Sequence, residues 1–233
     1  MFDWLNGATP GTELNLRHRS GWLAKELPEV DRLYGVPQRA EHHPEVDTGA
    51  HIELCLDVAA ALQASESVRV AVLLHDLGKA VTDPEKWPAH VDHEKLGVPW
   101  VARVAERFSL DEYTAQLATL VCEFHLQAHR AFDMRPQSII ALLEDHLFAS
   151  GVSTVEDFLT ACEADARGRL GRHDSLYRQG QYLRACALAL KDLPSPSQAE
   201  PQSKLWQDLH RNRLNAVRGI HRDFKSTFTA EMC

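Results

Sequence analysis

The stretch that most constrains this fold is an apolar run that ends in two ionisable residues. Residues 70–74 read Val-Ala-Val-Leu-Leu, His75 and Asp76 follow directly, and Gly78 and Lys79 come just behind. A hydrophobic core alone explains an adjacent imidazole and carboxylate poorly, whereas one wall of a metal site explains them well. Imidazole and carboxylate together suit divalent transition metals, which in turn suit phosphate ester hydrolysis. The hypothesis therefore requires further ligands from the rest of the chain.

Apolar residues recur at helical spacing along nearly the whole chain, and no strand pattern, internal repeat or phosphate-binding glycine loop is found. The pattern predicts an all-α fold. We expect residues 1–18, which mix Gly, Pro, Thr and Asn, to be irregular. We expect loop at residues 83–89. We expect helices at residues 21–27, 48–63 (capped by Asp47 or Thr48), from 65 or 67 through 77 (ending at Gly78), 92–108, from 109 or 111 through 124, 137–145, 153–166 and 176–190.

The clearest break in the helical pattern is residues 193–203, which hold three prolines and three serines. After it, apolar residues from Trp206 to Phe224 recur at helical spacing and predict a final amphipathic helix that packs back on the body. We therefore expect a flexible N-terminus (1–18), one domain (19–192), a linker (193–203) and a C-terminal helix (204–233). The polar side of that helix is predicted to be basic, through Lys204, Arg211, Arg213, Arg218, Arg222 and Lys225.

Composition limits the classes of protein that fit. The chain has 233 residues, 44% of them hydrophobic, and a formal net charge of -8, so any contact with RNA needs a local basic patch. Its five cysteines form no C-x-x-C pair, which indicates buried thiols in a reducing compartment. We see no signal peptide and no apolar run long enough to cross a membrane, so we expect a cytoplasmic protein.

Three predicted helices each direct one ionisable group toward the core. His51 lies on the stripe of Leu54 and Cys55, His125 lies on that of Leu117 and Val121, and Asp165 follows Phe158 and Cys162. A lone buried carboxylate is unfavourable unless it is paired or bound to metal. Arg169, one turn after Asp165, offers an ordinary ion pair as the alternative. Several such groups together favour a shared ion, as in helical bundles that build metal sites from facing helices.

Other polar residues are weaker candidates. His93 is a candidate ligand, whereas His90 fits a position facing solvent slightly better. His42 and His43 fit the mouth of the site and open water equally well. Lys79 fits a phosphate-binding cation, or a residue that neutralises a helix C-terminus. Arg167, Arg169 and Arg172 fit a solvated basic face at least as well as a phosphate contact, and no pattern assigns a role to His18, His129, His146, His173, His210 or His221.

The order His51, His75-Asp76, Asp165 resembles the H…HD…D signature of the HD-domain phosphohydrolase superfamily. The resemblance implies an HD-domain helical bundle in which these four residues hold one divalent metal. Members with two metals use extra histidines between the pair and the last aspartate, which implies that His93 and His125 hold a second ion bridged by Asp76. Such ligands allow Ni, Mn, Co, Fe or Zn, and they leave one ion or two open.

A narrower resemblance covers residues 20–190. Segments 27–38 (LPEVDRLYGVPQ), 43–51 (HPEVDTGAH), 75–79 (HDLGK), 123–125 (EFH) and 163–169 (EADARGR) look like the C-terminal HD half of bacterial CCA-adding tRNA nucleotidyltransferases. The Gly-Ser and Asp-x-Asp head of the nucleotidyltransferase half is missing from these residues, so we expect this chain not to add CCA.

This likeness implies a metal-dependent hydrolase of 2′,3′-cyclic nucleotides and of 2′-nucleotides or other phosphomonoesters, including phosphates at RNA ends. Asp76 and Lys79 are then the expected catalytic residues, and Lys79, Arg169 and His43 the expected substrate contacts. Two alternatives stay open. One is a non-catalytic module for tRNA binding or homodimer formation that uses the basic final helix. The other is hydrolysis of nucleoside triphosphates or signalling nucleotides.

Overall fold

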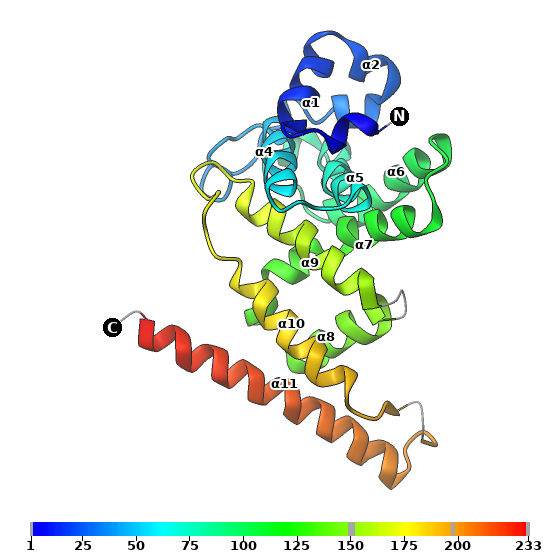
Figure 1. Ribbon diagram of the computed structural model, residues 1–233, viewed down its shortest axis with the longest axis vertical. Coiled ribbons are helices and arrows are strands. Elements are labelled where there is room, and N and C mark those ends of the chain that lie inside the picture. The colour runs from blue at the N-terminus through cyan, green and yellow to red at the C-terminus, as the bar shows by residue number, and fades with distance from the viewer. Residues whose placement is uncertain (1, 149–151, 197–198, 232–233) are drawn as a thin grey trace. The chain divides into compact units, whose positions relative to one another are not determined.

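The computed structural model describes residues 2–148, 152–196 and 199–231. Helices follow one another along this part of the chain (Figure 1), and it contains no strand, only one bridge between Pro37 and Asp47. The predicted all-α fold is therefore confirmed. Among the described residues, no helix combines the length and the apolar character needed to span a bilayer.

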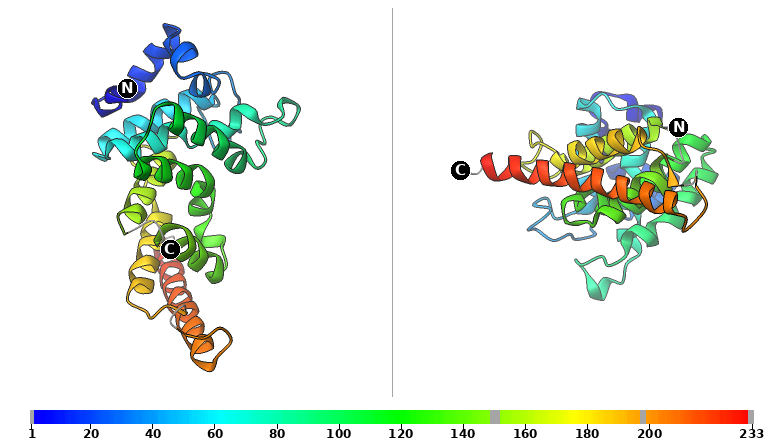
Figure 2. Two further views of the ribbon diagram at one scale, coloured as in Figure 1. Left: turned by 90° about the vertical axis from the view of Figure 1, so that its right-hand side faces the viewer. Right: turned by 90° about the horizontal axis from the view of Figure 1, so that it is seen from below.

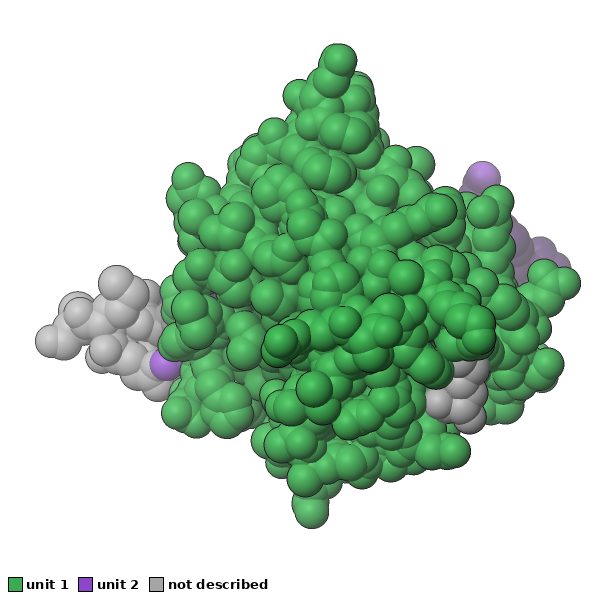
Figure 3. All heavy atoms as spheres, turned by 90° about the horizontal axis from the view of Figure 1, so that it is seen from above, with its two compact units in different colours: residues 1–129, 157–177 green, residues 130–156, 178–233 purple. Residues whose placement is uncertain are grey.

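Internal contacts divide the chain into two compact units (Figure 3). Unit 1 comprises Met1–His129 and Asp157–Tyr177, and unit 2 comprises Arg130–Glu156 and Arg178–Cys233. Both units contain residues from the segment 19–192 that the sequence analysis treats as one domain. The domain boundaries drawn from the sequence thus remain a prediction.

Unit 1 carries the helices of the N-terminal half. They are η1 (Asp3–Asn6), α1 (Pro10–Arg19), α2 (Trp22–Glu26), α3 (Pro28–Asp31), α4 (Thr48–Ala61), α5 (Glu66–Leu74), η2 (Leu77–Val81), η3 (Pro84–Lys86), α6 (His93–Arg107), α7 (Glu112–His129) and most of α9 (Val152–Arg167). Helix α5 packs against α4 and α7, and α6 packs against α7 and η2. Residues 70–74 of α5 are at most 1% exposed, so this helix runs through the core.

Capping side chains fix where these helices begin. The Ala50 amide donates to Asp47 Oδ1 at 2.9 Å, the Val68 amide to Ser65 Oγ at 3.4 Å, and the Thr114 amide to Asp111 Oδ1 at 3.0 Å. Each cap satisfies an amide that has no partner within its own helix. The sequence offers two alternatives for each start, and the caps select Asp47, Ser65 and Asp111.

Two predictions about local structure are wrong. Within the segment 1–18, the described residues 2–18 are not irregular, because Pro10 provides the fixed φ of a first helical turn and Leu5 and Leu14 are fully buried. The helix expected to end at Gly78 ends at Leu74. There His75 Nδ1 donates to the Val72 carbonyl at 2.8 Å, which gives that carbonyl a partner outside the regular helical pattern.

Unit 2 contains η4 (Ala131–Asp133), α8 (Pro136–Ala141), η5 (Leu142–Leu147), the first turn of α9, α10 (Arg178–Lys191) and α11 (Lys204–Glu231). Helix α11 lies along α10 and α8 (Figures 1 and 2). Leu209 and Val217 bury its apolar side, as the amphipathic pattern predicts. The described part of segment 193–203 forms turns and bends and one residue of 3-10 helix at Pro196, without any longer helix.

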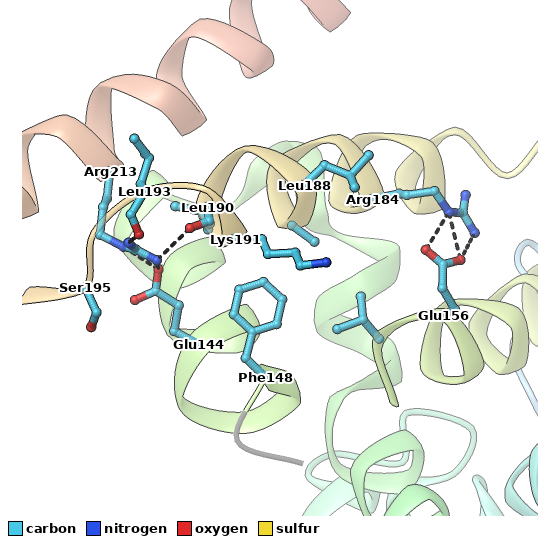
Figure 4. A pocket seen from close by; sticks show the side chains of 12 residues that line it. Glu144, Phe148, Glu156, Arg184, Leu188, Leu190, Lys191, Leu193, Ser195 and Arg213 are labelled. Carbon is cyan, nitrogen blue, oxygen red and sulfur yellow. Dashed lines mark hydrogen bonds and ion pairs between the residues drawn. The ribbon is translucent and has the colours of Figure 1, made fainter. Parts of the chain in front are cut away.

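Arg213 does not belong to the exposed basic face that the sequence predicts. It is 4% exposed, it pairs with Glu144, and it donates to the carbonyls of Leu190, Leu193 and Pro194 (Figure 4). Five donors in a planar fork allow Arg213 to join α11 to the end of α10 in this way. The other predicted basic residues of this face are exposed: Lys204, Arg211, Arg218, Arg222 and Lys225.

Candidate metal centre

Unit 1 gathers the six predicted ligands from five segments. His51 comes from α4, His75 and Asp76 from the turn that follows α5, His93 from the start of α6, His125 from α7 and Asp165 from α9. Every one of these residues is between 0 and 6% exposed. Buried ionisable side chains are rare unless they are paired or coordinate a metal.

One group of ligand atoms surrounds the Asp165 carboxylate. His51 Nε2 lies 3.1 Å from Asp165 Oδ1, and His75 Nε2 lies 3.8 Å from Asp165 Oδ2. One ligand atom from each of these three residues fits within a cluster whose members are all within 4.8 Å of one another. The geometric requirement of the metal hypothesis, that His51 and Asp165 face the His75 pair, is therefore met.

A second group surrounds Asp76. His75 Nε2 lies 3.2 Å from Asp76 Oδ2, while His93 Nε2 and His125 Nε2 lie 3.3 Å and 3.7 Å from Asp76 Oδ1. His75, Asp76 and His125 form another cluster within 4.8 Å. Asp76 thus faces imidazoles with both of its oxygens, and His75 belongs to both groups.

The unpaired atoms of the centre fit a cation. His75 Nε2, Asp76 Oδ1 and His93 Nε2 are buried and have no hydrogen-bond partner. A buried polar atom without a partner is destabilising by about 1–3 kcal/mol. These atoms are imidazole nitrogens and a carboxylate oxygen, which are ligands that divalent transition metals accept.

The tautomers of three histidines support this fit. The Nδ1 atoms of His75, His93 and His125 lie 2.8, 2.9 and 3.0 Å from the backbone carbonyls of residues Val72, His90 and Val121. A carbonyl only accepts, so each Nδ1 carries a proton and each ring turns its Nε2 toward the carboxylates. Metal-binding histidines are commonly oriented by such a contact. Lone pairs that face carboxylates repel them unless a proton or a metal ion lies between.

The electrostatics of the centre also favour a positive charge. Burial alone lowers the pKa of His75, but the Asp76 and Asp165 carboxylates outweigh it and raise that pKa to about 9. Burial raises the pKa of both carboxyl groups, yet His75 and Lys79 hold the pKa of Asp76 well below its usual value, and His129 and His75 do the same for Asp165. Burial and the His75 charge hold the pKa of His125 well below its usual value. Ionised acids beside a neutral imidazole suit a bound cation.

Lys79 lies inside the centre rather than at a helix end. Its Nζ donates to Asp76 Oδ2 at 2.6 Å and to Gln38 Oε1 at 2.5 Å, and the residue is 7% exposed. Since α5 ends at Leu74 and Lys79 belongs to η2, a role in neutralising the end of α5 is wrong. The ammonium group is therefore placed beside a candidate metal ligand.

The remaining predicted contacts lie at the border of the centre. Arg169 Nη2 is 4.0 Å from Asp165 Oδ1, at the outer limit of an ion pair. The His43 ring meets the His51 ring edge-on with 4.6 Å between centroids, and His43 Nδ1 lies 3.1 Å from Glu45 Oε1. His42 is exposed. Arg169 and His43 thus border the centre through Asp165 and His51.

Glu45 and His129 are members of the centre that the sequence analysis missed. Glu45 Oε1 lies 3.0 Å from His51 Nδ1, and His129 Nε2 lies 2.6 Å from Asp165 Oδ2. His129 follows His125 by one helical turn, so the spacing used for His125 could have identified it. Glu45 lies in a loop where no periodicity applies, and only its neighbour His43 in the motif pointed to it.

His90 is a structural residue and does not face solvent as expected. It is 4% exposed; Nε2 lies 2.7 Å from the Pro37 carbonyl and Nδ1 lies 2.7 Å from Thr82 Oγ1. Both ring nitrogens are therefore used, since Nε2 joins the chain that leads into α6 to Pro37 and Nδ1 joins it to Thr82.

Close packing at glycines brings the ligand-bearing segments together. A Cβ at Gly78 would lie 1.8 Å from the His93 carbonyl oxygen, and one at Gly168 would lie 2.6 Å from Cys55 Cα. Real Cβ atoms never approach so closely, so only glycine fits at these two positions. Gly78 allows the start of α6 to reach η2, which places His93 beside Asp76, and Gly168 allows the end of α9 to reach α4, which places Asp165 beside His51.

Comparison with known proteins agrees with this geometry. The family model described as HD domain matches residues 48–190. The chain is 42% identical over 219 residues to the multifunctional CCA protein of Alkalilimnicola ehrlichii, covering 93% of this chain and 53% of that protein. It is 40% identical over 212 residues to the multifunctional CCA protein of Pseudomonas aeruginosa (90% and 52%), and 44% identical over 192 residues to that of Halorhodospira halophila (82% and 46%).

The chain spans about half the length of these curated relatives. No solved structure matches it. The matched family region includes all six predicted ligands, from His51 to Asp165.

Proposed function

The chain belongs to the HD domain family, and on this premise we propose that unit 1 is a metal-dependent phosphohydrolase. Its proposed substrates are 2′,3′-cyclic nucleotides, with 2′-nucleotides and other phosphomonoesters as a second class. The observation that carries the proposal is the convergence of buried imidazole and carboxylate atoms, several without a hydrogen-bond partner, on one point of the core.

Two sets of ligands are proposed. His51, His75, Asp76 and Asp165 would hold the first ion, and Asp76 would bridge to a second ion held by His93 and His125. These ligands suit Ni, Mn, Co, Fe and Zn alike, and elemental analysis of the purified protein identifies which metal is bound. A bound divalent metal would supply a Lewis acid that polarises a phosphoryl oxygen and activates water.

The chain's own residues would supply position and charge. The Lys79 ammonium, fixed by Asp76 and Gln38, would stabilise negative charge that develops on phosphate in the transition state. Glu45 would hold the ring of His51 in place, and His129 would do the same for the carboxylate of Asp165. These contacts keep the ligands from reorienting during turnover.

A role in RNA binding is the second candidate, and it would accompany hydrolysis or replace it. The names of the relatives refer to CCA, and the exposed residues Arg211, Arg218, Arg222 and Lys225 of α11 recur on one helical face. Such a stripe suits the phosphate backbone of tRNA or an RNA end. A salt-sensitive shift of tRNA on a gel, without hydrolysis under any metal, would favour binding or a homodimer role over catalysis.

The proposed hydrolysis is tested with a substrate panel. Purified protein is incubated with 2′,3′-cyclic AMP, 2′-AMP, 3′-AMP, nucleoside triphosphates and signalling nucleotides, each with Mn, Co, Ni, Fe or Zn added. We expect turnover of the cyclic and 2′ compounds, lost in Asp76→Asn and kept in Asp83→Asn, whose side chain is 46% exposed. Parental turnover in a folded Asp76→Asn protein would exclude the mechanism, and turnover confined to triphosphates or signalling nucleotides would exclude the substrate class.

A further inference from the structure

Gln38 is a buried polar residue beside the centre, and the mechanism above uses only the oxygen of its side chain. It is 4% exposed, and its Oε1 accepts from Lys79 Nζ at 2.5 Å. Its Nε2 is also buried and has no hydrogen-bond partner. The amide cannot be reversed, because lysine only donates and therefore requires the oxygen of Gln38 on its side. The buried Gln38 atom without a hydrogen-bond partner is therefore an N–H donor.

The backbone of Gln38 is fixed by the segments that carry two of the candidate ligands. The Gln38 amide donates to the Val46 carbonyl at 2.6 Å, just before α4 and His51. The preceding Pro37 carbonyl accepts from His90 Nε2 at 2.7 Å, three residues before His93. Gln38 thus keeps its place relative to both sides of the centre. A rigidly held donor with no partner is typical of a preorganised binding group.

An open hollow of about 570 Å³ lies at this point of unit 1. Gln38 is the buried polar residue of its lining, whereas Arg39, Glu41 and His42 are exposed. Through Lys79, the Gln38 side chain connects this hollow to Asp76 by two hydrogen bonds. A small molecule in the hollow would therefore lie against Gln38, the residue whose Oε1 accepts from the Lys79 ammonium group.

We propose that Gln38 is a substrate-binding residue whose Nε2 donates to a phosphate oxygen of the substrate, with the rest of the substrate in the hollow lined by residues 38–42 and Pro88. The proposal rests on the phosphohydrolase function proposed above. Lys79 and Gln38 would then present two adjacent donors to one anionic group, one charged and one neutral. A phosphate oxygen would satisfy the donor that otherwise remains buried without a partner.

The alternative is that Gln38 only holds Lys79, and two variants separate the roles. Gln38→Glu keeps an acceptor for Lys79 but removes the donor, while Gln38→Met removes both without adding charge. Gln63→Glu adds the same charge at an exposed position of unit 1 and is the control. The readouts are the Kd for inorganic phosphate, measured calorimetrically with Mn²⁺ present, the KM for bis(p-nitrophenyl) phosphate and 2′,3′-cyclic AMP, and metal content.

We expect both Gln38 variants to raise the phosphate Kd and both KM values by about 10- to 100-fold, the loss that follows removal of a hydrogen bond to a charged acceptor. Metal content and the Gln63→Glu control should match the parent. Parental phosphate binding in Gln38→Glu would overturn the proposal: with a defect in Gln38→Met it would show that the residue only positions Lys79, and without one that it serves neither role. A defect confined to the nucleotide would place the acceptor on the nucleoside and overturn the phosphate assignment.

Failure of the inference and failure of the proposed function give different results. If the parent hydrolyses phosphate esters and the Gln38 variants behave like it, the Gln38 assignment alone is wrong. If the parent hydrolyses no ester with any metal, the proposed function is wrong, and the phosphate titration still decides whether Gln38 donates to phosphate.

Discussion

Among the described acidic residues of the centre, Asp76 lies within 4.0 Å of the most imidazole and ammonium groups. Its Oδ2 accepts from Lys79 at 2.6 Å, while Oδ1 faces His93 and His125 without a hydrogen bond. Oδ2 of this carboxylate thus has a hydrogen-bond partner, whereas Oδ1 has none and suits a cation. Glu45 contacts another candidate ligand, His51. Its effect on metal binding can be isolated by replacing one carboxylate oxygen with an amide nitrogen.

Glu45→Gln should weaken metal binding without unfolding the protein. Glu45 Oε1 lies 3.0 Å from His51 Nδ1, so the carboxylate orients that ring. Loss of such a partner reduces metal affinity by about 10- to 100-fold. Metal titration followed by calorimetry measures this, with the exposed Glu85→Gln as the control. Equal affinity in Glu45→Gln and the parent would show that Glu45 does not support His51.

At the scale of elements, the sequence predicted most of the helices and which of their residues are buried. Caps such as Asp47 and Ser65 are local chemistry, so their positions follow from the sequence. His51, His125 and Asp165 lie on apolar stripes, and periodicity therefore predicts their burial. Whether they meet at one point depends on how close the helices come, which is determined by contacts such as Gly78 with His93 that periodicity does not contain.

Gly78→Ala should separate η2 from α6 and damage the centre more than the fold. The new Cβ would collide with the His93 carbonyl, since it would lie 1.8 Å from that oxygen. We expect a loss of about 3 kcal/mol in the free energy of unfolding, together with loss of metal through displacement of His93. Chemical denaturation and elemental analysis measure the two effects.

Gly219→Ala is the matched control, because a Cβ there meets nothing within 4 Å and α11 favours alanine. It should leave metal content unchanged and stability equal or slightly higher. Gly78→Ala protein with parental metal content would contradict the view that this contact positions His93.

At the scale of the whole molecule, unit 1 contains every member of the proposed centre, and unit 2 contains α11 and its anchor. Helical spacing predicted that Arg213 lies on the exposed basic face of α11. This prediction is wrong, because Glu144 and three backbone carbonyls bind the buried guanidinium group. Glu45 and Gln38 escaped prediction for the same reason. Neither residue lies on a periodic stripe, and Gln38 meets its partner Lys79 across 41 residues of chain.

Arg213→Ala should destabilise unit 2 without altering the centre. It leaves Glu144 and three backbone carbonyls without their partner, and removal of one member of a buried pair is destabilising by about 3 kcal/mol. Arg211→Ala, which breaks an exposed pair with Asp208, should change stability by less than about 1 kcal/mol. Denaturant unfolding and elemental analysis report these effects. A large loss of metal in folded Arg213→Ala protein would contradict the assignment of all ligands to unit 1.

The most direct test of the account is metal stoichiometry, measured together with thermal unfolding of the purified chain. The account predicts one or two tightly bound divalent transition ions per chain. It also predicts that a chelator removes them and lowers Tm, and that returning the metal at about 100 times its Kd restores roughly 2.7 kcal/mol of stability. Protein that holds no stoichiometric ion after exposure to Mn, Co, Ni, Fe and Zn, and whose Tm none of them changes, would contradict it.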